Sequence, residues 1–121
     1  MTTQVLIVDD ITNVRQGLRT LLDLAGDIEI VGEASDGLEA IYLVEKLEPD
    51  VVILDLEMPV LDGYQAASQI KARFPSSTII ALTIHSCQEA IQQAIQAGVD
   101  SYLVKGTSFE ELIQAILEGK E

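Results

Sequence analysis

The feature that most constrains the fold is a set of short, nearly continuous apolar runs, rich in β-branched residues and spaced along the chain. Four such runs occupy residues 5–8, 51–54, 79–82 and 102–104. Runs of this kind are typical of parallel strands that are covered on both faces, whereas strands with one wet face alternate apolar and polar residues. A fifth run, at residues 28–31, includes the charged Glu29 and is therefore predicted to be an edge strand.

Helical periodicity fills the segments between these runs. One apolar stripe consists of Val14, Leu18, Leu21 and Leu22, and another of Phe109, Leu112, Ile113, Ile116 and Leu117. Capping-box spacing marks four helix starts, at residues 36–39, 62–65, 86–89 and 108–111. Helix ends are expected at Gly26, Gly98 and Gly119.

This alternation predicts one α/β domain over residues 1–121, a (βα)5 chain with a five-stranded parallel sheet and right-handed crossovers. No linker, repeat or low-complexity tract interrupts the pattern. The single cysteine, Cys87, excludes a disulfide framework. No apolar run approaches the roughly 20 residues that span a bilayer, so we expect a cytoplasmic protein without a membrane association.

The charge of the chain narrows its partners. Seven basic residues stand against twenty acidic ones, which gives a net charge of −13. A surface of that sign repels the phosphates of nucleic acids. We therefore expect no direct binding of nucleic acid by this domain.

Polar residues that could form one site follow four of the five predicted strands. Asp9 and Asp10 come after the first run and Asp55 after the third, while Thr83 and Lys105 follow the fourth and fifth. Ligands of open α/β sheets bind beyond the carboxyl ends of the strands, where these residues are expected to meet. Taken singly, each has a plainer interpretation, such as an acidic first helix turn for the aspartates or a solvated charge for the lysine.

Three carboxylates at one strand edge need a cation. Two unit charges about 4 Å apart repel by ~4 kcal/mol at an effective dielectric constant near 20. Mg²⁺ relieves such repulsion and prefers one or two carboxylates together with water and phosphate oxygens. An aspartate at such a site can attack phosphorus and form an aspartyl phosphate, whose oxygens a lysine and a hydroxyl would stabilise.

These residues lie in segments that resemble, in order and spacing, the motifs of bacterial response-regulator receiver domains. The segments are QVLIVDD, VVILDLEMPVLDG, IIALTIHS and GVDSYLVKG, and the resemblance covers the whole chain. It implies a flavodoxin-like fold with strand order 2-1-3-4-5, an arrangement for which a chemotaxis receiver is a known example.

The resemblance also implies a role for each site residue. Asp55 would accept the phosphoryl group of a sensor histidine kinase, and Thr83 and Lys105 would contact the phosphate. Asp10, Asp55 and the backbone carbonyl of Glu57 would bind Mg²⁺ directly, with Asp9 acting mainly through water.

The family's switch would involve Thr83 and the aromatic Tyr102, which turns inward when the threonine moves towards the phosphate. A half-buried core aromatic is an equally good interpretation of Tyr102. In the family this change alters the face made by the fourth helix, fifth strand and fifth helix, a possible homodimer surface. Phosphate shifts such an equilibrium only by binding one state more favourably.

The LTIH and GVDSYLVKG segments look closest to the receivers that carry a LuxR-type helix-turn-helix output domain. No such domain lies within the 121 residues. We therefore expect either a regulator of transcription whose DNA-binding domain is absent from this chain, or a stand-alone single-domain regulator.

The chain departs from the family pattern at two positions. Gly106 stands where the family often has proline, and Ile84 stands where many receivers keep a small residue. Glu57 and His85 occupy the variable positions at the site entrance.

A rival function is that of a phosphatase of the haloacid dehalogenase type, which also forms an aspartyl phosphate. That family places a second aspartate where this chain has Glu57, so we expect no enzyme activity.

Overall fold

A computed structural model of the chain describes residues 2–58, 60–84, 87–106 and 108–119. Within these residues strands and helices alternate without exception, which confirms the predicted (βα)5 chain. The elements are, in order, β1 (Thr3–Val8), α1 (Thr12–Asp23), β2 (Ile28–Ala34), α2 (Gly37–Leu47), β3 (Val51–Asp55), α3 (Gly63–Arg73), β4 (Thr78–Thr83), α4 (Gln88–Ala97), β5 (Ser101–Val104) and α5 (Phe109–Gly119).

The strands form one parallel sheet in the order β2-β1-β3-β4-β5, as predicted. β1 pairs with β2 on one side and with β3 on the other. The strands that follow β2 are therefore added on the opposite side of β1, where the strand order reverses. Because Val8 pairs with Leu54, the carboxyl ends of β1 and β3 lie side by side. Ligands of open α/β sheets bind at such a reversal point.

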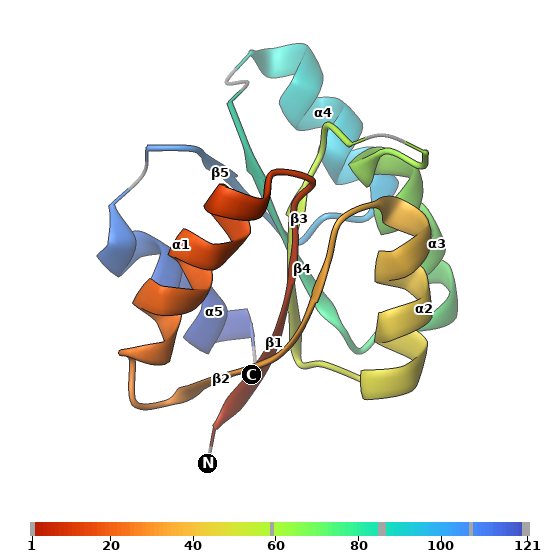
Figure 1. Cartoon of the computed structure of the whole chain (residues 1–121). Coiled ribbons are helices and arrows are strands. Elements are labelled where there is room, and N and C mark those ends of the chain that lie inside the picture. Colours follow the sequence, from red (N-terminus) through yellow and green to blue (C-terminus); the bar gives the residue numbers. More distant parts are fainter. Residues whose placement is uncertain (1, 59, 85–86, 107, 120–121) are drawn as a thin grey trace.

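Helices cover both faces of the sheet, with α1 and α5 on one side and α2, α3 and α4 on the other (Figure 1). Each face has its own apolar core, and the residues of β1 and β3 are almost wholly buried between them. β5 differs, because all four of its residues are only half-buried. Tyr102 packs against one core and Leu103 against the other, so both faces of β5 are covered, and its half-burial reflects its position at an edge of the sheet. The predicted edge position of β2 is confirmed.

Three of the four predicted helix starts are confirmed by their capping bonds. The side chains of Asp36 and Asp62 accept the N–H of the third helical residue at 2.9 Å, and the Ser108 hydroxyl does so at 3.3 Å. Ser86 lies outside the described residues. α4 begins at Gln88 after Cys87, whose side chain makes no capping bond.

The helix ends agree less well with the sequence pattern. Gly98 follows α4 in the left-handed conformation, with φ of 103°, as predicted. α1 ends at Asp23, before Gly26, and Gly119 is the last residue of α5. α2 ends at Leu47, and the capping residue Glu48 adopts φ of 47° without being a glycine.

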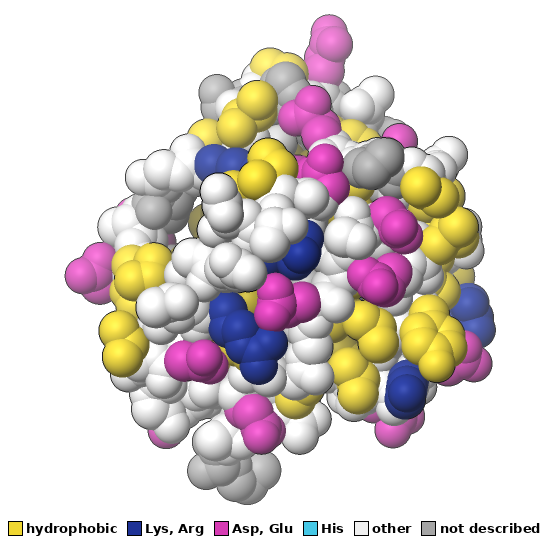
Figure 2. All heavy atoms as spheres, viewed as in Figure 1, with side chains coloured by type: hydrophobic (Ala, Val, Ile, Leu, Met, Phe, Trp, Pro, Cys, Tyr) yellow, Lys and Arg dark blue, Asp and Glu magenta, His cyan; other side chains and the backbone are white. Residues whose placement is uncertain are grey.

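Acidic side chains are scattered over the face shown in Figure 2, and basic ones lie in only a few places. This distribution agrees with the net charge of −13. Among the described helices, none has both the length and the apolar composition that crossing a bilayer requires.

Candidate functional site

The structure brings three aspartates together at the carboxyl edge of the sheet. Asp9 and Asp10 follow β1, and Asp55 is the last residue of β3. Asp9 and Asp55 are buried, with 2% and 5% of their surface exposed, whereas Asp10 is exposed. One carboxylate oxygen from each aspartate lies within 4.8 Å of the other two.

The loop after β3 holds the Asp55 carboxylate in place. The backbone N–H of Glu57 donates to Asp55 Oδ1 at 3.1 Å, and the N–H of Gly63 donates to the Leu56 carbonyl at 3.0 Å. A β-carbon at Gly63 would collide with the Asp55 carbonyl oxygen and the Leu56 α-carbon. The first turn of α3 therefore rests directly on the end of β3, which only a residue without a side chain permits.

Lys105 supplies a positive charge from the opposite side of the site. Its Nζ lies 3.4 Å from Asp9 Oδ2 and 3.8 Å from Asp55 Oδ2, so one ammonium serves two buried carboxylates. The backbone of the lysine is fixed as well, because its N–H donates to the Thr83 carbonyl at 2.6 Å. Gly106 follows with φ of 101°, a conformation that glycine adopts without strain.

Burial raises the pKa of Asp55 from its ordinary value of 3.8 to about 6. The hydrogen bond from the Glu57 N–H opposes this rise, the charge of Asp9 adds to it, Lys105 lowers the pKa again and Asp10 raises it slightly. Desolvation thus outweighs the bond and the ammonium that stabilise the carboxylate. At neutral pH the carboxylate is ionised, but it carries that charge at a cost.

Thr83 and Tyr102 form a pair beside the carboxylates. Thr83 ends β4 and is buried, and Tyr102 lies half-buried in β5 against the core under α3 and α4. Burial raises the pKa of the Tyr102 hydroxyl, and a hydrogen bond with the Thr83 side chain opposes that rise. The two residues expected to act together in a switch therefore influence each other's side chains.

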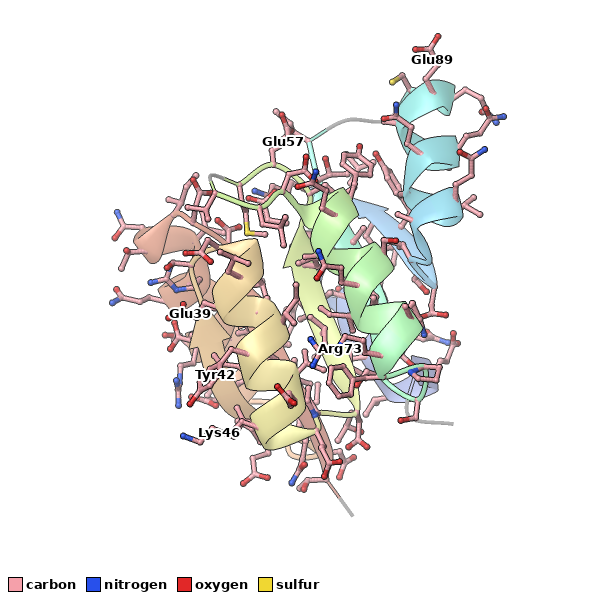
Figure 3. The ribbon with its side chains drawn as sticks, turned by 90° about the vertical axis from the view of Figure 1, so that its right-hand side faces the viewer. Glu39, Tyr42, Lys46, Glu57, Arg73 and Glu89 are labelled. Carbon is pink, nitrogen blue, oxygen red and sulfur yellow. The ribbon has the colours of Figure 1, made fainter. Side chains whose placement is uncertain are left out.

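An open cavity of about 280 Å³ exposes the site to solvent. Its lining residues are Asp10, Ile11, Asp55, Glu57, Ile84 and Lys105. Ile11 and Ile84 are 51% and 66% exposed and give this acidic cavity an apolar rim. Figure 3 shows the Glu57 side chain at the outer end of the loop beyond β3. His85 lies outside the described residues.

The donor set fits a hard divalent cation. Three carboxylates whose oxygens approach within 4.8 Å face one ammonium, which leaves an excess of negative charge at the edge of the sheet. Carboxylate oxygens are the ligands that Mg²⁺ prefers, and an open cavity leaves room for the water and phosphate oxygens that complete its octahedron.

Sequence reasoning did not identify Arg15 as a neighbour of the site. Its Nη1 donates to the backbone carbonyl of Asp9 at 2.6 Å. The sequence gives no signal for this contact, because it depends on the reach of a long side chain from α1 back to the preceding loop.

Comparisons with known proteins agree with this geometry. The sequence model of the response regulator receiver domain matches residues 5–117. The chain is 45% identical over 111 residues to the uncharacterized transcriptional regulatory protein YhcZ of Bacillus subtilis, covering 92% of this chain and 52% of that protein. It is 40% identical over 116 residues to the response regulator protein VraR of Staphylococcus aureus, covering 96% and 56% respectively.

A solved structure is similar over nearly the whole chain. A two-component response regulator of the LuxR family from Aurantimonas superposes with a TM-score of 0.92 at 32% identity, covering 98% of this chain and 84% of that one. The present chain spans about half the length of YhcZ and VraR.

Proposed function

This chain belongs to the response regulator receiver domain family, and we propose that Asp55 accepts a phosphoryl group from a histidine kinase and thereby changes the partners of the domain. The observation that carries the proposal is the convergence of three carboxylates and one lysine at the carboxyl edge of the sheet. Such a set suits the formation of an aspartyl phosphate.

The proposed reaction is a transfer from phosphohistidine to Asp55. An oxygen of the ionised carboxylate attacks phosphorus, the bond between phosphorus and the imidazole nitrogen breaks, and the imidazole keeps the bonding electron pair. The Glu57 N–H, which donates to Asp55 Oδ1, orients the carboxylate for attack. Lys105, within 4 Å of the carboxylates of Asp9 and Asp55, then pairs with the transferred phosphoryl group.

Asp10, Asp55 and the Glu57 carbonyl would hold Mg²⁺, with Asp9 acting mainly through a water molecule. When bound, the ion neutralises carboxylate charge and draws in phosphate oxygens. Thr83 would contact a phosphoryl oxygen at the expense of its hydrogen bond with Tyr102. Loss of that bond would free the Tyr102 side chain to change its position. The phosphate would in this way be coupled to the edge strand β5.

The output of the switch is proposed from the relatives. YhcZ is a transcriptional regulatory protein by name, and both it and VraR are about twice as long as the matched region. We propose that this domain controls transcription through a DNA-binding domain, because its own net charge of −13 repels DNA. A stand-alone regulator is the alternative.

A second copy of the chain is the proposed partner of the face formed by α4, β5 and α5. β5 is a half-buried edge strand, and Ile95 of α4 is 61% exposed. Size-exclusion chromatography before and after phosphorylation tests this proposal. A monomer in both states, or a dimer that Ile95→Glu leaves intact, would refute it.

Incubation with acetyl phosphate and Mg²⁺, followed by intact-mass measurement, tests the acceptor. We expect the mass of one phosphoryl group on the wild type and none on Asp55→Asn. Asp36→Asn is the matched control, since asparagine also caps helices and Asp36 lies at the start of α2. Labelling of Asp55→Asn would exclude the proposed acceptor, and steady turnover of p-nitrophenyl phosphate would favour a phosphatase.

A further inference from the structure

Hydrogen bonds hold Asp9 at its backbone N–H, its carbonyl oxygen and its side chain. Its N–H donates to the Ala34 carbonyl of β2 at 3.0 Å, and its Oδ1 accepts the Ile11 N–H at 2.9 Å. Its carbonyl oxygen accepts the 2.6 Å bond from Arg15. The backbone that leads into Asp10 is therefore held by a guanidinium from the first turns of α1.

Arg15 is itself held by the neighbouring strand. Its Nε lies 3.3 Å from Oε1 of Glu33, and the other oxygen of Glu33 accepts a 2.7 Å bond from Arg19. The Arg15 and Glu33 side chains are only 15% and 25% exposed. The hydrogen bond from Arg19 is the main reason why the pKa of Glu33 lies below its ordinary value, so the anchor of Arg15 stays ionised.

The charges of this cluster cancel. Arg15 and Arg19 carry two positive charges, while Glu33 and Asp23, which lies 3.9 Å from Arg19, carry two negative ones. Figure 2 shows basic side chains beside acidic ones on the face that α1 and β2 present. A neutral cluster does little to screen the nearby carboxylates, so its contribution to the site is geometric.

The loop needs such an anchor because α1 begins without a side-chain cap. Ile11 occupies the capping position and offers no acceptor, and the first turn of the helix contains no acidic residue. Asp10 is exposed and directly precedes this uncapped start. Mg²⁺ tolerates little deviation from octahedral geometry, and functional side chains must be held to within about 0.5 Å.

We infer that Arg15 is a positioning residue of the metal site, which fixes the Asp9 carbonyl and thereby sets the direction in which Asp9 and Asp10 present their carboxylates. This inference rests on the proposed function. It assigns the arginine no contact with Mg²⁺ or phosphate. The planar guanidinium is required, because it donates from Nη1 to Asp9 and from Nε to Glu33 at the same time.

The test compares Arg15→Lys, which keeps the charge and loses the fork, with the wild type. Partners outside the ligand shell typically change metal affinity by 10- to 100-fold, so we expect the Mg²⁺ dissociation constant to rise by roughly tenfold or more. The labelling rate at saturating Mg²⁺ should stay within roughly twofold, since only the metal requirement changes. Calorimetric titration with Mg²⁺ and labelling over a Mg²⁺ series measure both.

Two further variants separate positioning from general destabilisation. Glu33→Gln removes the charged anchor and should weaken Mg²⁺ binding in the same direction. Arg73→Lys is the matched control, because Arg73 pairs with Glu45 at 3.5 Å between α3 and α2, away from the loop. In the metal-free protein, amide exchange at Asp9 and Ile11 should accelerate in Arg15→Lys and not in Arg73→Lys.

Wild-type Mg²⁺ affinity in Arg15→Lys would overturn the inference, because charge would then suffice. An equal loss in Arg73→Lys would overturn it too, by showing that any weakened arginine pair has the same effect. If the wild type itself neither binds Mg²⁺ nor becomes labelled, the proposed function fails, and that result is distinct from a normal wild type beside a normal Arg15→Lys.

Discussion

The amino and carboxyl edges of the sheet differ in how fully their polar side chains are paired. At the amino edge, Asp100 Oδ2 accepts the Ile79 N–H at 2.8 Å and pairs with Lys71 Nζ at 2.7 Å. The buried Ser77 donates its hydroxyl proton to the Pro49 carbonyl at 2.9 Å. Each group there finds its partner within the fold.

At the carboxyl edge three aspartates gather, and Lys105 lies 3.4 Å from the carboxylate of Asp9 and 3.8 Å from that of Asp55. The burial of Asp55 and the neighbouring charge of Asp9 raise its pKa to about 6, so the fold does not fully compensate the charge. The uncompensated negative charge is therefore a property of the carboxyl edge and does not follow from the acidic composition of the chain alone. The amino edge is the one whose polar groups are paired, and the proposed reaction lies at the other.

Replacing the lysine of each edge gives the largest expected difference. Lys105→Met should lower the rate of labelling by acetyl phosphate by roughly 10²- to 10³-fold, the usual cost of losing a charge-stabilising group in an active site. Lys71→Met should label at the wild-type rate. Intact-mass time courses measure both, and a similar rate in the two variants would abolish the distinction between the edges.

The pH dependence of stability gives the next effect, of about 3 kcal/mol. An acid whose pKa is raised in the folded state binds its proton more tightly when folded, so stability falls as pH rises from about 4 to about 6 and then levels off. For Asp55, with a pKa near 6 in place of 3.8, the loss amounts to about 3 kcal/mol. Asp55→Asn should lack this loss of stability, because asparagine has no carboxyl group to titrate.

Urea denaturation in EDTA at pH 4 and pH 7 measures this difference. We expect the stability of Asp55→Asn relative to the wild type to increase as the pH rises. In a second series, with Mg²⁺ in place of EDTA, this increase should be smaller because the ion stabilises the wild type. Parallel pH profiles for the two proteins would show that Asp55 bears no burial cost.

At the amino edge the expected effect is on stability and is smaller. Lys71→Met removes the 2.7 Å bonds to Asp100 and to the Ser77 carbonyl and should cost about 1 kcal/mol, since the Asp100 side chain is 40% exposed. Lys46→Met, on the exposed face of α2 (Figure 3), is the control and should stay within about 0.5 kcal/mol of the wild type. Equal unfolding free energies for both variants would contradict the prediction.

The smallest effect concerns the rim of the cavity. Ile84 lines the cavity beside Asp55, and its truncation in Ile84→Ala should open the acyl phosphate to water and speed its hydrolysis by roughly two- to fivefold, less than 1 kcal/mol of barrier. Leu24→Ala, at an 80% exposed position after α1, should decay like the wild type. Phosphate release after removal of the donor measures both rates, and equal decay in Ile84→Ala would remove any shielding role.

The fold was predictable where a local signal repeats. Apolar runs, four nearly continuous and one interrupted by Glu29, identified the five strands. Polar caps such as Asp36 and Asp62 marked helix starts. The left-handed conformation of Glu48, which caps the end of α2, was not predictable, because a residue other than glycine rarely adopts it. The half-burial of β5 follows from the strand order that the family resemblance implies, because the apolar run alone does not show which strand has a single neighbour.

The candidate site was predictable as a set of strand ends and not as a set of contacts. Parallel strands bring their carboxyl ends to one edge, so order along the chain was enough to group the aspartates with Lys105. The cluster of Arg15, Arg19 and Glu33 joins α1 to β2 through long side chains, and no spacing rule predicts such reach. The same limit applies to the hydrogen bond between Thr83 and Tyr102.

The bare approach of Gly63 to the end of β3 has a mechanical consequence. Where side chains separate two elements, rotamer changes absorb a small displacement, but here backbone meets backbone and the joint is stiff. We therefore expect a shift of the strand that carries Asp55 to move the first turn of α3 with it. The proposed phosphorylation of Asp55 would then displace α3 as well as the strand beneath it.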